Sequence, residues 1–390
     1  MRKRLGSLAT AILLIVTLAP SAAASPNRDV MFVGNNWDGT VDLVDARTFT
    51  KYQRIDVVGD LEERKASMTP DQLIAMLVIR RTAGEGHDQL VDDIMVSPDG
   101  RTMYVSRPSL GDVSAFDVAT GEQLWVRRVD GYRSDHMALS PDGRTLLVSA
   151  TTANVVDAVD TATGSITGRF ESGDFPHENQ YSPDGKTIYN ATIGNVVAPD
   201  DPLLDAAKGR RWLTVADAET LRVREVIDFG VGIRPFVIMP DQRTMYAQLS
   251  FHNGFIEYDL QQRRRTRTVH LPLSEEAKQL RRDEYPLDSA HHGLTMNRDH
   301  SKICDAGTIS DYAAILSVPS LTVDRIVPTG KKPYWAATSP DGKHCFLSNS
   351  DSDDISVVSF ENPREIARIP VGDHPQRVRG YSVPADVLAP

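Results

Sequence analysis

The chain has 390 residues, a formal net charge of −10 and only two cysteines. The acidic balance argues against general nucleic-acid binding, because an acidic surface repels phosphate backbones. Two cysteines cannot form a disulfide framework in a chain of this length, so a large hydrophobic core must hold the fold together.

The N-terminal segment has the features of a secretory signal peptide. A basic start, RKR, precedes the apolar run LATAILLIVTL, and small residues at A-x-A spacing end at Ala24. The apolar run is too short to span a bilayer comfortably, which argues against a transmembrane segment. We therefore expect residues 1–24 to be removed and the mature chain to be secreted, periplasmic or associated with the cell envelope. Removal takes away three positive charges and no negative ones, so the net charge falls from −10 to −13.

A four-residue turn motif recurs along the remaining chain. The motif SPDG, or a decayed version of it, begins at Ser97, Ser140, Ser182, Met239, Asn297 and Ser339. The spacings are 43, 42, 57, 58 and 42 residues. A unit of about 42 residues, with two longer copies, is typical of a four-stranded propeller blade.

Each unit contains four predicted strands. An apolar run leads into the turn, a second strand such as RTMYVS or RTLLVS follows, and two further strands complete the unit. Pro-Asp-Gly supplies a fixed φ, a local side-chain cap and a positive φ, which together favour a tight hairpin turn. Alternating hydrophobicity and β-branched residues favour strands over helices.

The two ends of the chain supply a seventh unit. The segment from Asp29 has strands two to four of a unit without its first strand, whereas HPQRVRGYSV, from His374, resembles a first strand alone. Joining them closes the ring and removes exposed sheet edges. We therefore predict an all-β fold: a seven-bladed β-propeller closed by its C-terminal strand, with short helical insertions on one face, forming a single domain over residues 25–390.

One repeat resembles that of a known family. KPYWAATSPDGKHCFLSNS, from Lys332, is similar to the pattern P-x-x-x-A-x-S-P-D-G-x-x-x-Y-V-x-N of the YVTN-repeat, surface-layer-type seven-bladed β-propellers. The resemblance extends from about Asp29 to Val383. It implies the fold, but related propellers serve as surface, binding and occasionally catalytic proteins, so the fold does not identify an activity.

Three insertions interrupt the repeats, at residues 57–89, 196–211 and 271–290. They fall in loops that join second to third strands, or a fourth strand to the next blade. In a propeller these loops share one face, which we call the mouth face. Insertions that arise without selection should occur on both faces. Their presence on one face alone therefore predicts that the mouth face binds a ligand or a partner.

Two of the insertions contain predicted helices. In SMTPDQLIAMLVIRR, Thr69 can cap a helix, Pro70 suits its first position and Gln72 completes a capping box. This helix either packs on the propeller rim or serves as a lid or partner-docking element. LPLSEEAKQLRRDEYPL also has a helical pattern after Ser274. The apolar face predicted for the first helix comprises Leu73, Met76, Leu77 and Val78.

The first strands of the blades line the central channel, so residues at their mouth ends can converge despite their separation in sequence. We expect these residues to bind a ligand. Imidazoles and carboxylates around one opening suit a divalent transition metal, with His136, His177 and His292 as the expected ligands. The residues at the mouth ends are Asp92, Asp93, His136, His177, Glu178, Arg234, His291, His292, Tyr334, Trp335 and Arg377.

Two functions follow from such a mouth. The first is an exported propeller that binds a small molecule or a cell-envelope protein, with the histidines bonded only to neighbouring loops. The second is a metal-dependent hydrolase, lyase or oxidoreductase, or a metal-free acid–base catalyst, because histidine titrates near neutrality. The chain has no convincing phosphate-binding glycine loop and no GxSxG nucleophile motif. The sequence leaves the choice open and does not indicate an oligomeric state.

The two cysteines, Cys304 and Cys345, lie on predicted second strands of adjacent blades. Packed sheets are about 10 Å apart, whereas the Cα atoms of a disulfide usually lie within about 7 Å of each other. We therefore predict two buried free thiols.

Overall fold

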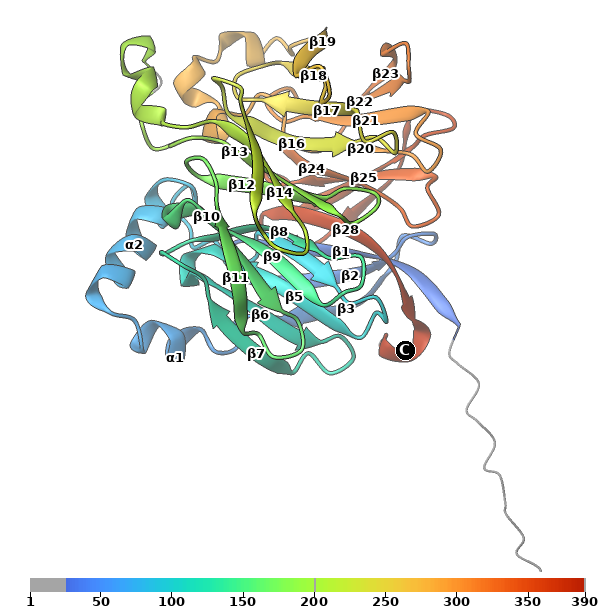
Figure 1. Cartoon of the computed structure of the whole chain (residues 1–390). Coiled ribbons are helices and arrows are strands. Elements are labelled where there is room, and N and C mark those ends of the chain that lie inside the picture. The colour runs from blue at the N-terminus through green and yellow to red at the C-terminus, as the bar shows by residue number, and fades with distance from the viewer. Residues whose placement is uncertain (1–25, 200, 389–390) are drawn as a thin grey trace, which may run out of the picture.

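The computed structural model describes residues 26–199 and 201–388, which form seven four-stranded antiparallel sheets arranged in a ring (Figure 1). This confirms the predicted seven-bladed propeller.

Blade 1 contains β28 (Pro375–Pro384), β1 (Asn27–Asn35), β2 (Thr40–Asp45) and β3 (Lys51–Asp56). Blade 2 contains β4 (Asp93–Val96), β5 (Thr102–Arg107), β6 (Asp112–Asp117) and β7 (Gln123–Arg128). Blade 3 contains β8 (Ser134–Leu139), β9 (Thr145–Ala150), β10 (Val155–Asp160) and β11 (Ile166–Glu171).

The remaining four blades follow in chain order. Blade 4 contains β12 (Pro176–Tyr181), β13 (Thr187–Thr192), β14 (Trp212–Asp217) and β15 (Val223–Asp228). Blade 5 contains β16 (Ile233–Ile238), β17 (Thr244–Leu249), β18 (Gly254–Asp259) and β19 (Arg264–His270). Blade 6 contains β20 (Leu294–Met296), β21 (Lys302–Gly307), β22 (Tyr312–Ser317) and β23 (Thr322–Pro328). Blade 7 contains β24 (Pro333–Thr338), β25 (His344–Asn349), β26 (Asp354–Ser359) and β27 (Glu365–Pro370).

The recurring SPDG motif forms the turn between the first two strands of a blade, as blade 2 illustrates. The hydroxyl of Ser97 accepts a hydrogen bond from the backbone N–H of Thr102 at 2.9 Å. Asp99 accepts from the N–H of Arg101 at 3.1 Å, and Gly100 has a φ of +73°. The serine and aspartate satisfy backbone donors of the turn and the glycine supplies its left-handed residue, so each position of the motif has its own physical reason.

The ring is closed by the C-terminal strand. β28 pairs antiparallel with β1, from Asn27 opposite Pro384 to Asn35 opposite Pro375, and Figure 1 shows the two ends of the chain side by side. The inner strands β28, β4, β8, β12, β16, β20 and β24 each contact the next around the ring. Large apolar side chains such as Phe32 and Phe236 are buried between blades. The channel is therefore lined by one strand from every blade.

The three insertions lie on one side of the ring, at the left and upper left of Figure 1. None of the helices in the described ranges is long and apolar enough to cross a membrane. The first insertion contains α1 (Leu61–Ala66) and α2 (Pro70–Arg81), and the second contains the 3₁₀ helix η3 (Pro202–Lys208). The third contains the 3₁₀ turns η4 (Ala277–Gln279), η5 (Arg282–Glu284) and η6 (Pro286–Asp288). Other 3₁₀ turns are η1 (Pro108–Leu110), η2 (Thr151–Ala153) and η7 (Ala385–Val387).

Helix α2 begins at Pro70 as predicted, and the side chain of Gln72 accepts a hydrogen bond from the Thr69 N–H at 3.0 Å. Its predicted apolar face is wrong in three of four positions, because only Met76 of that set is buried and Ile79 is the second buried residue. The exposed fractions of Leu73, Leu77 and Val78 are 41%, 50% and 49%. The helix therefore presents most of its apolar side chains to solvent.

The prediction of a helix after Ser274 is also wrong. The segment forms three separate 3₁₀ turns, and Leu280 between the first two is extended, with φ −70° and ψ 135°. Ala277 is the one buried residue of its first turn. A short helix without an apolar face to pack is marginal, and Pro286 further limits its length.

The prediction of free thiols is contradicted, because Cys304 of β21 and Cys345 of β25 form a disulfide with a Cα–Cα distance of 6.5 Å. The assumed spacing of packed sheets does not hold here. Propeller blades converge toward the axis, and the buried side chains of Ala306, Ala313 and Ala336 lie in the same apolar cluster as the two cysteines. Small side chains let the two blades approach closely enough for the bond.

We expect both cysteines to resist alkylation in the unfolded, non-reduced protein and to be labelled after reduction, as mass spectrometry can show. Replacing both by alanine should lower the free energy of unfolding by roughly 2–4 kcal/mol, because the bond reduces the conformational entropy of the unfolded chain. Labelling of both thiols without reductant would contradict the assignment.

Deletion of residues 372–390 tests the ring closure. The variant should aggregate or melt at a much lower temperature. β1 loses β28, one of its two paired strands, and the buried side chains of Val378 and Val383 are removed. The measurement is a thermal melt followed by circular dichroism and size-exclusion chromatography. A truncated protein that melts like the full-length chain would rule out a stabilising role for β28.

Candidate functional site

Two repeat positions place polar side chains at the mouth end of the channel. The fifth residues before the turn motifs are Asp92, Asp135, His177, Arg234, His292 and Tyr334. The fourth residues before them are Asp93, His136, Glu178, Pro235, Gly293 and Trp335. In blade 1, Gln376 and Arg377 hold the equivalent places, because Arg377 pairs with Gly34 on β1 as Asp93 pairs with Ser106 on β5. The site is thus two rings of side chains, one residue apart.

Three histidines from separate blades meet in these rings. A ligand nitrogen of each of His136, His177 and His292 lies within 4.8 Å of the others, and all three side chains are buried. The Nε2 atoms of His177 and His292 are 3.3 Å apart, and the Nδ1 atoms of His136 and His177 are 2.8 Å apart. The structure therefore brings together the residues that the sequence singled out as metal ligands.

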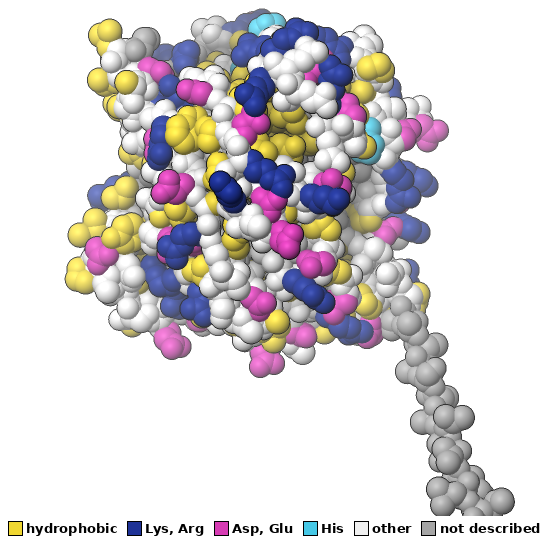
Figure 2. All heavy atoms as spheres, viewed as in Figure 1, with side chains coloured by type: hydrophobic (Ala, Val, Ile, Leu, Met, Phe, Trp, Pro, Cys, Tyr) yellow, Lys and Arg dark blue, Asp and Glu magenta, His cyan; other side chains and the backbone are white. Residues whose placement is uncertain are grey.

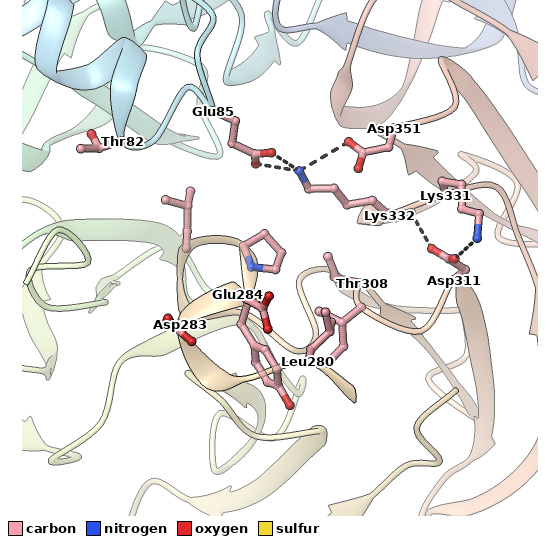
Figure 3. Close-up of a pocket in the computed structure, with 14 residues that line it drawn as sticks. Thr82, Glu85, Leu280, Asp283, Glu284, Thr308, Asp311, Lys331, Lys332 and Asp351 are labelled. Carbon is pink, nitrogen blue, oxygen red and sulfur yellow. Dashed lines mark hydrogen bonds and ion pairs between the residues drawn. The ribbon is translucent and has the colours of Figure 1, made fainter. Parts of the chain in front are cut away.

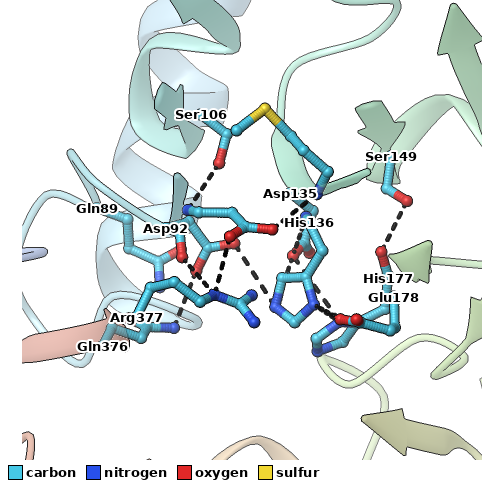
Figure 4. Close-up of polar contacts among 12 residues, drawn as sticks. Gln89, Asp92, Ser106, Asp135, His136, Ser149, His177, Glu178, Gln376 and Arg377 are labelled. Atoms are coloured by element: carbon cyan, nitrogen blue, oxygen red, sulfur yellow. Dashed lines mark hydrogen bonds and ion pairs between the residues drawn. The ribbon is translucent and has the colours of Figure 1, made fainter. Parts of the chain in front are cut away.

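Neighbouring groups fix the orientation of the imidazoles, as Figure 4 shows for His136 and Glu178. Oε2 of Glu178 lies 2.6 Å from Nδ1 of His136, and the carbonyl oxygen of Tyr334 lies 3.0 Å from Nδ1 of His292. The ring of Tyr334 also stacks on His292, with centroids 4.3 Å apart. The Nε2 atom of His292 is consequently left facing His177.

The histidines are held in their neutral form. Burial lowers the pKa of His136 and His292 well below the usual value and lowers that of His177 to about 3. The positive charge of Arg377 adds to the effect of burial on all three pKa values. Neutral imidazoles retain the lone pairs that a metal ion needs, so the cluster is ready to bind one without first losing protons.

A pair of carboxylates lies beside the histidines. Oδ1 of Asp135 is 3.5 Å and Oδ2 of Asp92 is 4.0 Å from Nε2 of His136. Burial and the neighbouring Asp135 raise the pKa of Asp92 well above its usual value. Burial acts in the same direction on Asp135, but Arg133 and His177 hold the pKa of that carboxyl below its usual value. Oδ2 of Asp92 has no hydrogen-bond partner among the described residues, which leaves a buried acceptor beside the cluster.

Four other predicted residues, Asp93, Glu178, Trp335 and Arg377, share the repeat position of His136. The guanidinium of Arg377 lies 3.4 Å from the ring centroid of Trp335, and its Nε is 3.3 Å from Asp93. Asp93 also pairs with Arg379 at 2.8 Å. Burial raises the pKa of Glu178 to about 7. Of these groups, Glu178 and Trp335 contact His136 directly.

Two predicted residues do not join the cluster. His291 turns away and contacts Asp305 and, at 3.0 Å, Asn253. Arg234 is fully buried and binds Ser250 and the carbonyl of Leu287, so it links blade 5 to the third insertion.

A cavity of about 110 Å³ opens above the histidines. Its floor is formed by residues of the two rings, and its walls come from all three insertions and from the neighbouring loops. The wall residues are Val78, Ile79, Thr82, Ala83, Thr152, Phe175, Ile193, Val196, Val197 and Leu287.

A second cavity, of about 570 Å³, lies between the first and third insertions (Figure 3). There, Nζ of Lys332 lies 2.6 Å from Glu85 and 3.5 Å from Asp351, which ties the tip of the first insertion to blade 7. No histidine of the described part of the chain lines this cavity. Its lysines are already paired with carboxylates, so we place the site at the histidines instead.

The sequence reasoning missed three polar residues of the floor. Asp135 and Gln376 occupy the same repeat position as Asp92, so alignment of the repeats could have found both. Arg133 lies before the strand and outside both repeat positions, and no sequence signal marked it. Its guanidinium contacts Asp135 and donates to Gln89 of the first insertion at 3.1 Å.

The chain matches no protein-family model, and no curated protein matches its sequence. The solved structures that it resembles include the following two. One is hydrazine synthase of Kuenenia stuttgartiensis, with a TM-score of 0.60 and 19% identity over 89% of this chain and 99% of that one. The other is the dihydro-heme d1 dehydrogenase NirN in complex with DHE, with a TM-score of 0.56 and 14% identity over 95% of this chain and 78% of that one. Both likenesses show the fold alone.

The lowered pKa of His177 predicts a pH dependence in metal-free protein. Its pKa is about 3 in the fold against 6.5 for an ordinary histidine, so the unfolded chain binds more protons between these pH values. The stability contribution is complete above pH 6.5 and is lost as the pH falls toward 3. Relative to a His177→Asn variant, the wild type should lose up to about 1.4 kcal/mol of unfolding free energy per pH unit between pH 6 and 4.

Denaturant unfolding in the presence of a chelator measures this difference. His270→Asn, at the exposed end of β19, is the matched control and should track the wild type at every pH. Parallel pH profiles for the wild type and His177→Asn would contradict the prediction.

Proposed function

We propose that the protein is a metal-dependent enzyme whose divalent transition metal is held by His136, His177 and His292 and which acts on a small molecule at the mouth of the propeller. The observation that carries the proposal is the convergence of three buried, neutral imidazoles from three blades on one cavity. Structural zinc sites usually have four protein ligands, whereas catalytic sites have three and an open position. Three histidines under a cavity match the catalytic pattern.

One pair of the three histidines has the spacing that such an ion requires. Nitrogen ligands about 2.0–2.1 Å from a tetrahedral metal are about 3.3 Å apart, and the Nε2 atoms of His177 and His292 are separated by 3.3 Å. The Oδ2 atom of Asp92 is buried beside the cluster and receives no hydrogen bond from the described residues, and a cation there would stabilise the ionised form of this carboxyl. Imidazole donors favour zinc, copper, nickel or iron over magnesium and calcium.

The surrounding residues would hold the ligands in place. Glu178 would orient His136, and the Tyr334 carbonyl would orient His292, as second-layer groups do in metalloproteins. A bound divalent metal supplies Lewis acidity that polarises a carbonyl or lowers the pKa of water. Asp92 and Asp135 lie where they can accept hydrogen bonds from a ligand in the cavity. The binding of a small molecule or envelope protein without any metal is the alternative that the experiment below tests.

We further propose that the chain is an exported, single-domain propeller of the YVTN-repeat type. Its SPDG turns and seven-blade closure support the repeat type, and its signal-like N-terminus supports export. Residues 1–24 lie outside the described residues. The Cys304–Cys345 bond adds independent support, because disulfides persist mainly in oxidising compartments.

Metal analysis tests the proposed function. Protein purified without a histidine tag should retain or take up about one zinc, copper, nickel or iron ion per chain, as measured by mass spectrometry and calorimetry. His136→Ala, His177→Ala and His292→Ala should each weaken the affinity for the metal by roughly 100-fold, since ligand and second-layer changes have large effects. His270→Ala is the control and should bind like the wild type. A protein that binds none of these metals, or three mouth variants with unchanged affinity, would refute the metal centre.

A further inference from the structure

The floor and the walls of the mouth cavity differ in chemistry. Histidines and carboxylates form the floor, whereas the walls above them are mainly apolar and include Val78 of α2, Val197 of the second insertion and Leu287 of the third. A ligand that reaches the histidines must therefore pass between apolar side chains. Such walls stabilise a ligand only if part of the ligand is apolar too.

The apolar surface continues outward from the cavity. Val78 and Val197, which line it, are still 49% and 51% exposed. Figure 2 shows hydrophobic side chains along the left edge, where Figure 1 places α2 and, above it, the second insertion. Val78 and Val197 border one opening, so the exposed apolar side chains of both segments begin at the cavity. The exposed apolar side chains of these segments are Leu73, Ile74, Leu77, Val78, Val197, Leu203 and Leu204.

The floor has equal numbers of acidic and basic side chains, so a metal ion would add an uncompensated positive charge. Four carboxyl groups and three guanidinium groups lie beside the histidines, and Arg234 acts on His177 and His292 through its charge, so the eight formal charges cancel when all are ionised. A divalent ion at the histidines would leave a charge of +2 in a buried site, and an uncompensated buried charge is costly. An anionic ligand group would offset it. The acids are Asp92, Asp93, Asp135 and Glu178, and the bases are Arg133, Arg234, Arg377 and Arg379.

Buried donors point to the same kind of group. Nε of Arg133, a residue of the cavity floor, has no hydrogen-bond partner among the described residues, although the residue is only 8% exposed. Arg377 does not line the cavity, but in Figure 4 its guanidinium points toward His136. An unpartnered guanidinium nitrogen is a ready donor for a carboxylate or similar anion.

We infer that the ligand of this site is a small amphipathic anion, with an acidic head at the histidines and a short alkyl or aryl chain between α2 and the second insertion. The inference rests on the proposed metal centre and names the class of its substrate. A cavity of about 110 Å³ holds the head and the first carbon atoms, since a water-sized group occupies about 30 Å³. The rest of the chain contacts the apolar side chains outside, which explains why α2 leaves them unburied.

A series of straight-chain hydroxamates tests the inference on zinc-loaded protein. Acetohydroxamate probes the metal alone, and the butano-, hexano- and octano- homologues add the chain. Calorimetry should show affinity rising roughly two- to fourfold with each methylene until the chain passes the rim. Hexanoate should also bind at least tenfold more tightly than hexan-1-ol, because only hexanoate carries the anionic head.

Variants locate the chain. Val78→Asp and Val197→Asp should abolish the dependence on chain length while zinc content stays unchanged, because neither side chain is a ligand of the metal. Val226→Asp is the matched control, because Val226 is 41% exposed on β15, outside the cavity, and this variant should behave like the wild type. Zinc-loaded protein that binds every hydroxamate equally, or hexanol as well as hexanoate, overturns this inference and leaves the metal centre standing. Failure to bind zinc or another transition metal overturns both.

Discussion

The antiparallel pairing of β28 with β1 is the constraint on which the rest of the structure depends. It joins the two ends of the described chain and makes blade 1 a complete four-stranded sheet. A ring of seven inner strands gives every inner strand a packed neighbour on both sides, and it also fixes the distances across the channel. Because His136, His177 and His292 come from blades 3, 4 and 6, their approach depends on every blade holding its place.

The site shows how a β-propeller can bury charge near its axis. Inner strands alternate in side-chain direction, so adjacent residues of one strand serve two layers of the channel. Asp93 is fully buried yet pairs with Arg377 and Arg379, and it also accepts the Met137 N–H at 2.9 Å. Such satisfied pairs are tolerable in a low-dielectric interior, whereas unpartnered groups are costly. The unpartnered oxygen of Asp92 and the unpartnered Nε of Arg133, two residues that line the cavity, therefore stand out as places for a ligand.

The insertions convert an open channel into a defined cavity. Lys332 joins the first insertion to blade 7, Arg133 joins it to blade 3 through Gln89, and Arg234 holds the third insertion to blade 5. These ion pairs and hydrogen bonds hold the first and third insertions against the blades, whereas apolar side chains of α2 remain unburied. The histidines alone would form a wet, exposed cluster. The insertions give them a dry, shaped surrounding, and burial is the main reason that their pKa values are low.

The seven blades, the closing strand, the face of the insertions and the three histidines can be predicted from the sequence, because each depends on a repeat spacing or a position within the repeat. Three features depend on the folded chain: His291 faces Asp305 rather than the cavity, Arg133 reaches the floor, and Met76 and Ile79 form the packed side of α2. The tertiary structure also decided the Cys304–Cys345 bond, since the approach of two blades depends on small residues from several strands. Local patterns fix strand period and turn type, whereas side-chain direction at a strand end and the spacing between blades depend on contacts among residues far apart in the chain.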